Sequence, residues 1–244
     1  MGKKGLVVFA VMTVASAMLF AGCMSVMGRA SYQTHGDPAG TNFTLGYSEV
    51  TVDKDGNVTK ITLDDYFLPG TWALISETVP ADMDGATTTT VDGKVYASKI
   101  RIGNSVFEFD SDTSAYKGNV LGTDVNDLIT WFARDNNRTQ EQNLWYIDAC
   151  RNGQLAYLKA DGNPSSTKPS YTTGGKTTTT MSKNETGYWT IENGLGWTGN
   201  RDAIVVYAES QNGNVTDVDI VAGATASDTR NYLETIRLAR QAAQ

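Results

Sequence analysis

The stretch YSEVTVDKDGNVTKITLDDY, residues 47–66, decides the first part of the fold. Apolar and polar residues alternate on both sides of Asp55-Gly56, and this alternation is typical of strands that bury one face. An Asp-Gly pair between two such runs is the strongest short signal for a β-hairpin. We therefore expect two antiparallel strands that meet at Asp55-Gly56.

Four other stretches predict further strands. Two of them have an Asn-Gly pair at the centre, which predicts a hairpin: residues 203–223 (AIVVYAESQNGNVTDVDIVAG) and residues 143–160 (NLWYIDACRNGQLAYLKA). The other two are short runs rich in β-branched and aromatic residues: KVYASKIRI at 94–102 and SVFEFD at 105–110. Most of the chain is therefore expected to form antiparallel sheets.

A short sequence repeat accompanies the hairpin signals. Gly-Asn-Val-Thr occurs at 56–59 and again at 213–216, and each copy is followed by Gly-Ala-Thr, at 85–87 and at 223–225. These coincidences are consistent with an internal duplication. The alternative is that such turn sequences are common in any β-rich protein.

Two segments have the periodicity of amphipathic helices. Residues 123–136 place apolar side chains at the i, i+3, i+4, i+7 spacing, namely Val125, Leu128, Ile129 and Phe132. Thr123 or Asp124 is the expected cap. The C-terminal segment 227–244, capped by Ser227 or Asp228, carries one apolar face, namely Tyr232, Ile236 and Ala239. The predicted fold class is α+β, with mainly antiparallel sheets and two helices.

The N-terminus has the layout of a secretory signal peptide. Lys3 and Lys4 precede an apolar run from 6 to 21, which is shorter than the about 20 residues a membrane-spanning helix needs. The following FAGC, residues 20–23, resembles a bacterial lipobox, although Phe20 replaces the usual Leu. We expect cleavage before Cys23 and acylation of its thiol. The alternative is a plain signal peptide that contains a cysteine.

Residues 24–41 and 162–187 are rich in small and polar residues. We interpret the first range as a flexible tether and the second as an exposed loop. The only histidine, His35, lies in the predicted tether. This position argues against hydrolases that use a histidine base.

Charge and cysteine content exclude further classes. Removal of Lys3 and Lys4 lowers Lys+Arg from 20 to 18 while Asp+Glu stays at 27, so the mature chain carries a net charge of −9. Such an acidic protein is not expected to bind nucleic acid, which requires clustered Lys and Arg. With Cys23 acylated, Cys150 is the one remaining thiol, so no intramolecular disulfide or cysteine-based metal site is expected.

The segment DIVAGATASDTR, residues 219–230, has the chemistry of an anion site. It predicts a strand that leads into a helix N-terminus, where free N–H groups and the positive end of the helix dipole favour negative charge. Gly223 and Ala224 allow close approach to the backbone, and Thr225 and Ser227 supply hydroxyl groups. The alternative is an ordinary capped helix after a tight turn.

The same segment resembles the flavinylation motif Asp-x-x-Ser/Thr-Gly-Ala-Thr of FMN-binding domains. Members of that family occur in the sodium-translocating NADH:quinone reductase, in the related ferredoxin-dependent complex, and among exported lipoproteins of extracellular electron transfer. In the family, a transferase links FMN through a phosphoester to the final Thr. Asp219, Gly223, Ala224 and Thr225 match the motif, and Ala222 departs from it. The departure leaves non-covalent FMN as a second option.

Other candidate sites are weaker. The first Gly-Ala-Thr, ending at Thr87, has Asp84 where the motif has Ser or Thr, which disfavours a phosphate there. The acidic loop around Asp110 lacks the Gly and the distal Glu of a calcium loop, so no metal site is expected. Tyr188, Trp189 and Trp197 either contact a flavin ring or fill the core.

These observations predict four parts of the chain: a signal peptide (1–22), a tether (23–41), a β-rich N-terminal half (42–140) and an FMN-binding domain (141–244). The resemblance implies an exported electron carrier, lipid-anchored to the cell membrane or outer membrane, with a flavin transferase and membrane redox proteins as partners. No catalytic residue of its own is expected, and the redox chemistry belongs to the flavin. The alternative is a cofactor-free surface lipoprotein that binds a ligand or has a structural role.

Overall fold

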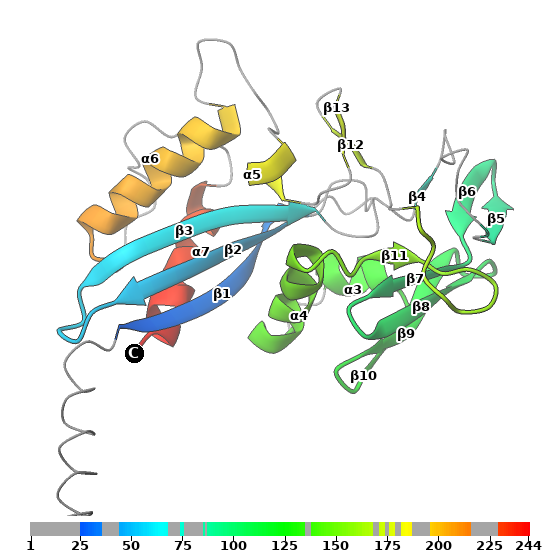
Figure 1. Ribbon diagram of the computed structural model, residues 1–244, viewed down its shortest axis with the longest axis horizontal. Coiled ribbons are helices and arrows are strands. Elements are labelled where there is room, and N and C mark those ends of the chain that lie inside the picture. The colour runs from blue at the N-terminus through cyan, green and yellow to red at the C-terminus, as the bar shows by residue number, and fades with distance from the viewer. Residues whose placement is uncertain are drawn as a thin grey trace, which may run out of the picture.

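The computed structural model describes residues 25–35, 44–67, 74–75, 85, 87–134, 138–167, 171–173, 176–178, 182–186, 196–215 and 229–244. Antiparallel sheets and separate helices make up these ranges, so the predicted α+β class is confirmed (Figure 1). Five helices occur there rather than the two expected. Within the described residues, none of them combines the length and apolar character needed to cross a membrane.

The first sheet has the strand order β1-β2-β3 and is antiparallel throughout. Its strands are β1 (Val26–His35), β2 (Thr44–Val52) and β3 (Val58–Phe67). β2 and β3 form the predicted hairpin, and Gly56 in its turn has a φ of 81°, which favours glycine.

β1 corrects the prediction of a flexible tether up to residue 41. Every residue from Val26 to Gln33 pairs with β2, and the pairing ends with His35 opposite Thr44. The physical reason lies in partners far along the chain. Small side chains such as Ala30 and Ser31 are typical of a flexible tether, but here they are buried within the fold. A segment with weak strand propensity is therefore ordered by pairing and packing.

Two helices pack on one face of the first sheet (Figure 1): α6 (Gly196–Ser210) and α7 (Thr229–Ala242). α7 confirms the C-terminal helix, and its predicted apolar face is buried. The contact with β1 is very close, because a Cβ added to Gly28 would lie 2.1 Å from the Ala239 carbonyl oxygen. α7 thus lies directly on the backbone of β1.

α6 corrects the strand expected at the start of residues 203–223. Its buried side chains follow a helical spacing, namely Trp197, Asn200, Ile204 and Ala208. The Asn212-Gly213 pair follows the end of this helix: Asn212 and Gly213 have φ values of 51° and 70°, and the Gly213 amide bonds to the Ala208 carbonyl. Left-handed residues of this kind commonly terminate helices.

The second sheet has the order β10-β9-β8-β7-β11. Its strands are β7 (Lys99–Ile102), β8 (Ser105–Asp110), β9 (Ala115–Val120), β10 (Thr123–Val125) and β11 (Ala156–Tyr157). Two small sheets accompany it, formed by β4 (Leu74–Ile75), β5 (Thr88–Val91) and β6 (Lys94–Ala97), and by β12 (Tyr171–Thr173) and β13 (Lys176–Thr178). The strand predicted at 105–110 is confirmed, whereas the one predicted at 94–102 is divided at Ser98 into β6 and β7, which belong to different sheets.

Two helices, α3 (Leu128–Arg134) and α4 (Gln140–Arg151), belong with the second sheet. α3 confirms a helix within 123–136, but it is capped by Asp127, since Thr123 belongs to β10. α4 corrects the hairpin predicted for 143–160. It begins with a capping box between Thr139 and Gln142, and Gly153 with a φ of 63° follows its end.

Two hydrophobic cores hold these elements together. One lies between the first sheet and α6 and α7, and it includes Val50, Leu63, Trp197 and Ile236. The other joins the ends of β2 and β3 to the second sheet, α3 and α4, and includes Tyr66, Phe107 and Phe132. Because the first core contains residues from both sides of residue 140, it crosses the boundary expected between two domains.

Candidate functional site

The residues predicted from the motif and the lipobox lie outside the described part of the chain. These are Cys23, Asp219, Ala222, Gly223, Ala224, Thr225 and Ser227. The described chain resumes at Thr229, the first residue of α7. The part of the structure nearest in sequence to the predicted site is therefore the start of α7.

The start of α7 contacts the far end of the first sheet. The Asn231 side-chain amide donates to the Thr34 carbonyl at 2.9 Å, and the Tyr232 hydroxyl donates to Asp65 Oδ2 at 2.8 Å. Asp65 belongs to a group of buried polar side chains at this end, which we name the acid–lysine cluster. Its members are Thr34, Thr44, Asp64, Asp65, Ser182, Lys183 and Tyr232.

Asp65 is the centre of the acid–lysine cluster and has no exposed surface. Lys183 Nζ lies 2.6 Å from its Oδ2, and the Thr34 hydroxyl lies 2.6 Å from its Oδ1. The Lys183 ammonium also lies over the rings of Phe67 and Trp197, at 5.5 and 5.3 Å from their centroids. A buried carboxylate is stable only with such compensation, because water is excluded from both charges.

Asp64 adds a second buried carboxyl group beside the first. Its Oδ1 accepts from the backbone N–H groups of Asp65 and Asn184 at 2.7 and 3.1 Å, and its Oδ2 accepts from the Ser182 hydroxyl at 2.6 Å. Burial raises the pKa of Asp64 to about 6, the negative charge of Asp65 adds to this increase, and the three hydrogen bonds oppose it. Perturbed buried carboxyls of this kind occur at functional sites.

The lysine side of the cluster comes from a short helix, α5 (Lys183–Thr186), within the range predicted to be an exposed loop. The expectation is wrong at Ser182 and Lys183, which are buried. The Asn184 side chain connects α5 to its neighbours, since it donates to the Leu63 carbonyl and accepts from the Trp197 indole N–H at 2.8 Å. The sequence contained one signal for this site: Asp64 and Asp65 are adjacent acidic residues inside a predicted strand.

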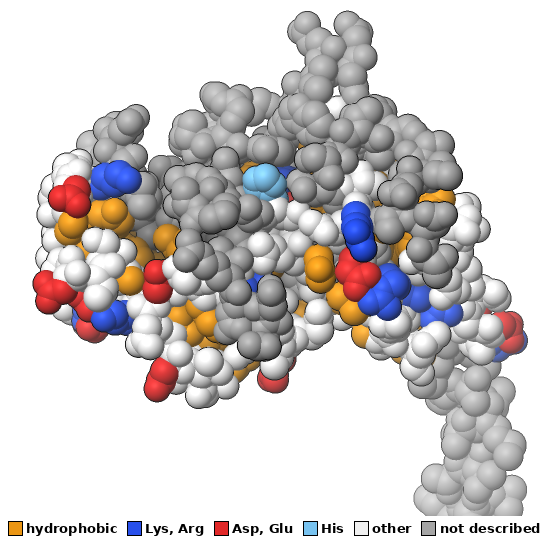
Figure 2. All heavy atoms as spheres, turned by 180° about the vertical axis from the view of Figure 1, so that it is seen from behind, with side chains coloured by type: hydrophobic (Ala, Val, Ile, Leu, Met, Phe, Trp, Pro, Cys, Tyr) orange, Lys and Arg blue, Asp and Glu red, His pale blue; other side chains and the backbone are white. Residues whose placement is uncertain are grey.

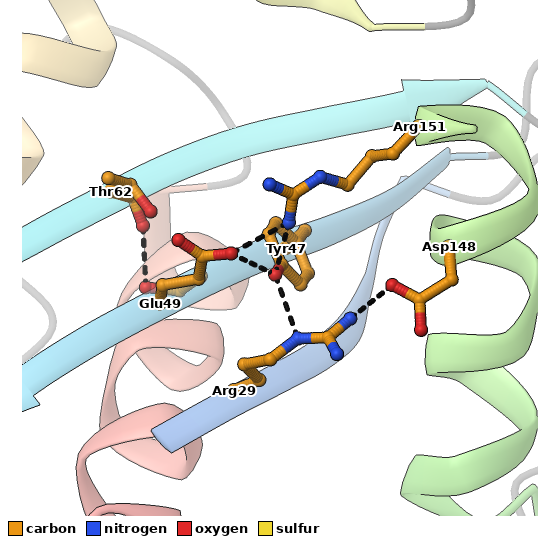
Figure 3. Close-up of polar contacts among 7 residues, drawn as sticks. Arg29, Tyr47, Glu49, Thr62, Asp148 and Arg151 are labelled. Atoms are coloured by element: carbon orange, nitrogen blue, oxygen red, sulfur yellow. Dashed lines mark hydrogen bonds and ion pairs between the residues drawn. The ribbon is translucent and has the colours of Figure 1, made fainter. Parts of the chain in front are cut away.

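A second polar group joins the first sheet to α4 (Figure 3). The Tyr47 hydroxyl accepts from Arg29 Nε at 2.9 Å and from Arg151, and it donates to Glu49. Arg29 also forms an ion pair with Asp148, and Arg151 lies 2.7 Å from Glu49. Burial and the bond to Glu49 raise the pKa of Tyr47 to about 12, so its hydroxyl stays protonated.

The first residue of α4 also bonds to the free edge of β1 at Ser31. The Gln140 side-chain amide accepts from the Ser31 N–H at 3.0 Å and donates to the Ser31 carbonyl at 2.9 Å, as a neighbouring strand would. Because every charge of the Arg29–Tyr47 group has a partner within it, we interpret this group as a structural connection. It is not our candidate for a ligand site.

The remaining predicted residues are placed as follows. Trp197 is buried in the core under α6, as the core alternative predicted. Thr87 is exposed, and its carbonyl accepts from Ser98. Burial raises the pKa of the Cys150 thiol to about 12, which makes it a poor nucleophile. Among the described residues, no group of three His, Cys, Asp or Glu side chains could hold a metal ion.

A comparison of the chain with family models, with curated proteins and with solved structures found no match. The candidate site therefore rests on its own chemistry. In the described part of the chain it consists of the start of α7 and the buried acid–lysine cluster that contacts it. Acidic and basic side chains are interspersed on the face shown in Figure 2.

Proposed function

We propose that this protein is an exported, lipid-anchored FMN-binding protein that carries electrons at the membrane. The observation that carries the proposal is the position of the motif in the chain. Residues 219–227 lead directly into α7, and the first turns of α7 are fixed to the acid–lysine cluster through Asn231 and Tyr232. The helix that this segment precedes in the sequence is therefore fixed to a buried part of the fold.

The start of α7 is suited to a phosphoester. Its first turn contains no acidic residue, and Arg230 adds a positive charge. The helix dipole favours an anion at this end by about 0.3–1 kcal/mol, and the negative charge of Asp228, which directly precedes Thr229, opposes it. Thr225 precedes Thr229 by four residues, which span about 14 Å at most. Lys183 compensates the charge of Asp65, and hydrogen bonds from the Ser182 hydroxyl and two backbone N–H groups stabilise Asp64.

Bound FMN would supply one- and two-electron redox chemistry. The chain itself would contribute attachment at Thr225, orientation by α7, and the fixed charges of the acid–lysine cluster. A flavin transferase and redox proteins at the membrane would be its partners. The lipid anchor would be Cys23, at the cell membrane or outer membrane.

The second candidate is a cofactor-free surface lipoprotein with a binding or structural role. Ala222 favours it, because this residue replaces the Ser or Thr of the motif. It requires no flavin and would use exposed polar loops for recognition.

Flavin fluorescence distinguishes the two functions. The mature protein, expressed in a host that has the flavin transferase, is denatured, separated on a gel and illuminated. We expect a fluorescent band that Thr225→Val abolishes. Thr87→Val is the matched control, because Thr87 ends the other Gly-Ala-Thr and is exposed. Flavin that is released on denaturation indicates non-covalent binding, and a protein without any flavin supports the second candidate.

A further inference from the structure

The first strand begins close in sequence to the proposed lipid anchor. Val26, the first residue of β1, follows Cys23 by three positions and pairs with Val52 on β2. Only Met24 and Ser25 separate the acylated residue from a hydrogen-bonded strand. The folded body therefore has little freedom to move away from the bilayer.

The first sheet has two distinct ends, and the proposed anchor and the candidate site lie at opposite ones. β1 runs from Val26 to His35, which corresponds to about 30 Å of extended strand. α7 runs back along it. Its start bonds to Thr34 near the end of β1, whereas Ala243, just after it, packs on Gly28. Figure 1 accordingly shows the C-terminus near the beginning of β1.

The end near Cys23 exposes an apolar pair. Val26 and Met27 are 46% and 53% exposed, and they are the only large exposed hydrophobic residues adjacent in sequence within the described ranges. The others are single: Tyr32, Val106, Leu121 and Val206. An exposed apolar pair beside an acylated residue would add buried apolar area to the membrane contact.

We propose that the Val26–Met27 end of the first sheet is seated on the lipid surface, and that β1 is a rigid spacer directed away from it. The start of α7 is then held about 30 Å from the acylated residue. The proposal rests on the lipid anchor of the proposed function. It adds an orientation, in which the start of α7 lies at the end of the first sheet that faces away from the lipid.

Fluorescence quenching in vesicles tests the orientation. Met27→Cys and His35→Cys lie at opposite ends of β1, and both positions are exposed. Each acylated variant is labelled with a small fluorophore and bound to phosphatidylcholine vesicles that contain nitroxide-labelled headgroups. The unsubstituted protein controls for labelling of Cys150, which is partly buried and whose raised pKa disfavours reaction. We expect several-fold stronger quenching at 27 than at 35.

Equal quenching at both positions, or none at 27, would overturn the proposal. A second measurement tests the apolar contact: Val26→Ser with Met27→Ser should release acylated protein from vesicles several-fold faster, with an unchanged melting temperature. Val206→Ser on α6 is the matched control and should have no effect on release. Unchanged release of the double variant contradicts the contact.

The outcomes also separate this proposal from the proposed function. Mass spectrometry reports whether Cys23 is acylated, and a chain without the acyl group overturns both the anchor and the orientation. An acylated protein with equal quenching overturns the orientation alone. In-gel flavin fluorescence reports the carrier function independently of either result.

Discussion

Lys183 on α5 and Asp65 on β3 form an ion pair with 2.6 Å between Nζ and Oδ2, and both side chains are almost completely buried. The pair connects a short helix late in the chain to the end of the first sheet. It lies beside Tyr232, which brings the start of α7 to the same carboxylate. The candidate site therefore depends on three elements that are distant in sequence.

Lys183→Met should destabilise the protein strongly, because it leaves the Asp65 carboxylate buried without its cation. The expected loss in the free energy of unfolding is about 3–5 kcal/mol, measured by urea denaturation. The double variant Lys183→Met, Asp65→Asn should recover part of this loss, since it removes the uncompensated charge. A loss below about 1 kcal/mol for the single variant would show that the pair is not buried as described.

Asp64 should make stability depend on pH. Its pKa is raised to about 6 in the folded protein, so the folded state binds the proton more tightly than the unfolded state. The stability gained from protonation is full below about pH 4 and is lost as pH rises through about 6.

Asp64→Asn should remove this loss. The amide oxygen can accept the two backbone bonds that Oδ1 now accepts, and its NH2 group can donate to the Ser182 hydroxyl. We expect the variant to be more stable than the parent by about 3 kcal/mol at about pH 8, with a small difference at about pH 4. Parallel urea titrations at both pH values measure it, and a difference independent of pH contradicts the assignment.

Gly28→Ala tests whether β1 belongs to the folded body. The added methyl group would meet the backbone of α7 at 2.1–2.6 Å, so either the helix or the strand must move. We expect a loss of at least about 2 kcal/mol in unfolding free energy. Met27→Ala, at the exposed neighbouring position, should change it by less than about 0.5 kcal/mol. Similar losses of unfolding free energy for both variants would show that residues 26–35 are not packed against α7 and form a tether.

Ala222→Ser should increase the fraction of protein that carries covalent flavin, because it restores the hydroxyl residue of the motif. The ratio of flavin absorbance to protein absorbance after denaturation measures this fraction. Ala226→Ser is the matched control, as it adds a hydroxyl outside the motif. An equal fraction in the parent and Ala222→Ser would show that this motif position does not limit attachment.

Local sequence signals predicted the parts of the fold that are determined by near neighbours. The Asp55-Gly56 hairpin and the apolar face of α7 were predicted correctly, since turn geometry and helical periodicity act over a few residues. The two Asn-Gly pairs were misleading. A left-handed glycine fits a hairpin turn and a helix end equally well, and both pairs follow helices here.

The helix end at Asn212-Gly213 shows that contacts distant in sequence help to determine local structure. The Asn212 side chain, directly before the second Gly-Asn-Val-Thr, accepts from the Val58 N–H of the first copy at 2.6 Å, and Gly213 lies against the Val58 side chain. The copies nevertheless have different surroundings, since the first leads into β3 and the second follows α6. Such a contact between residues 154 positions apart has no local signature in the sequence.

By itself, the sequence determined the fold class, the first hairpin, the final helix and the motif from which the flavin proposal follows. Only the tertiary structure decided that residues 26–35 form a strand and that Asp64 and Asp65 meet Ser182 and Lys183. The physical reason is that strand pairing and burial of charge depend on partners far along the chain. A polar segment is ordered, and a carboxylate is buried, only when those partners are in place.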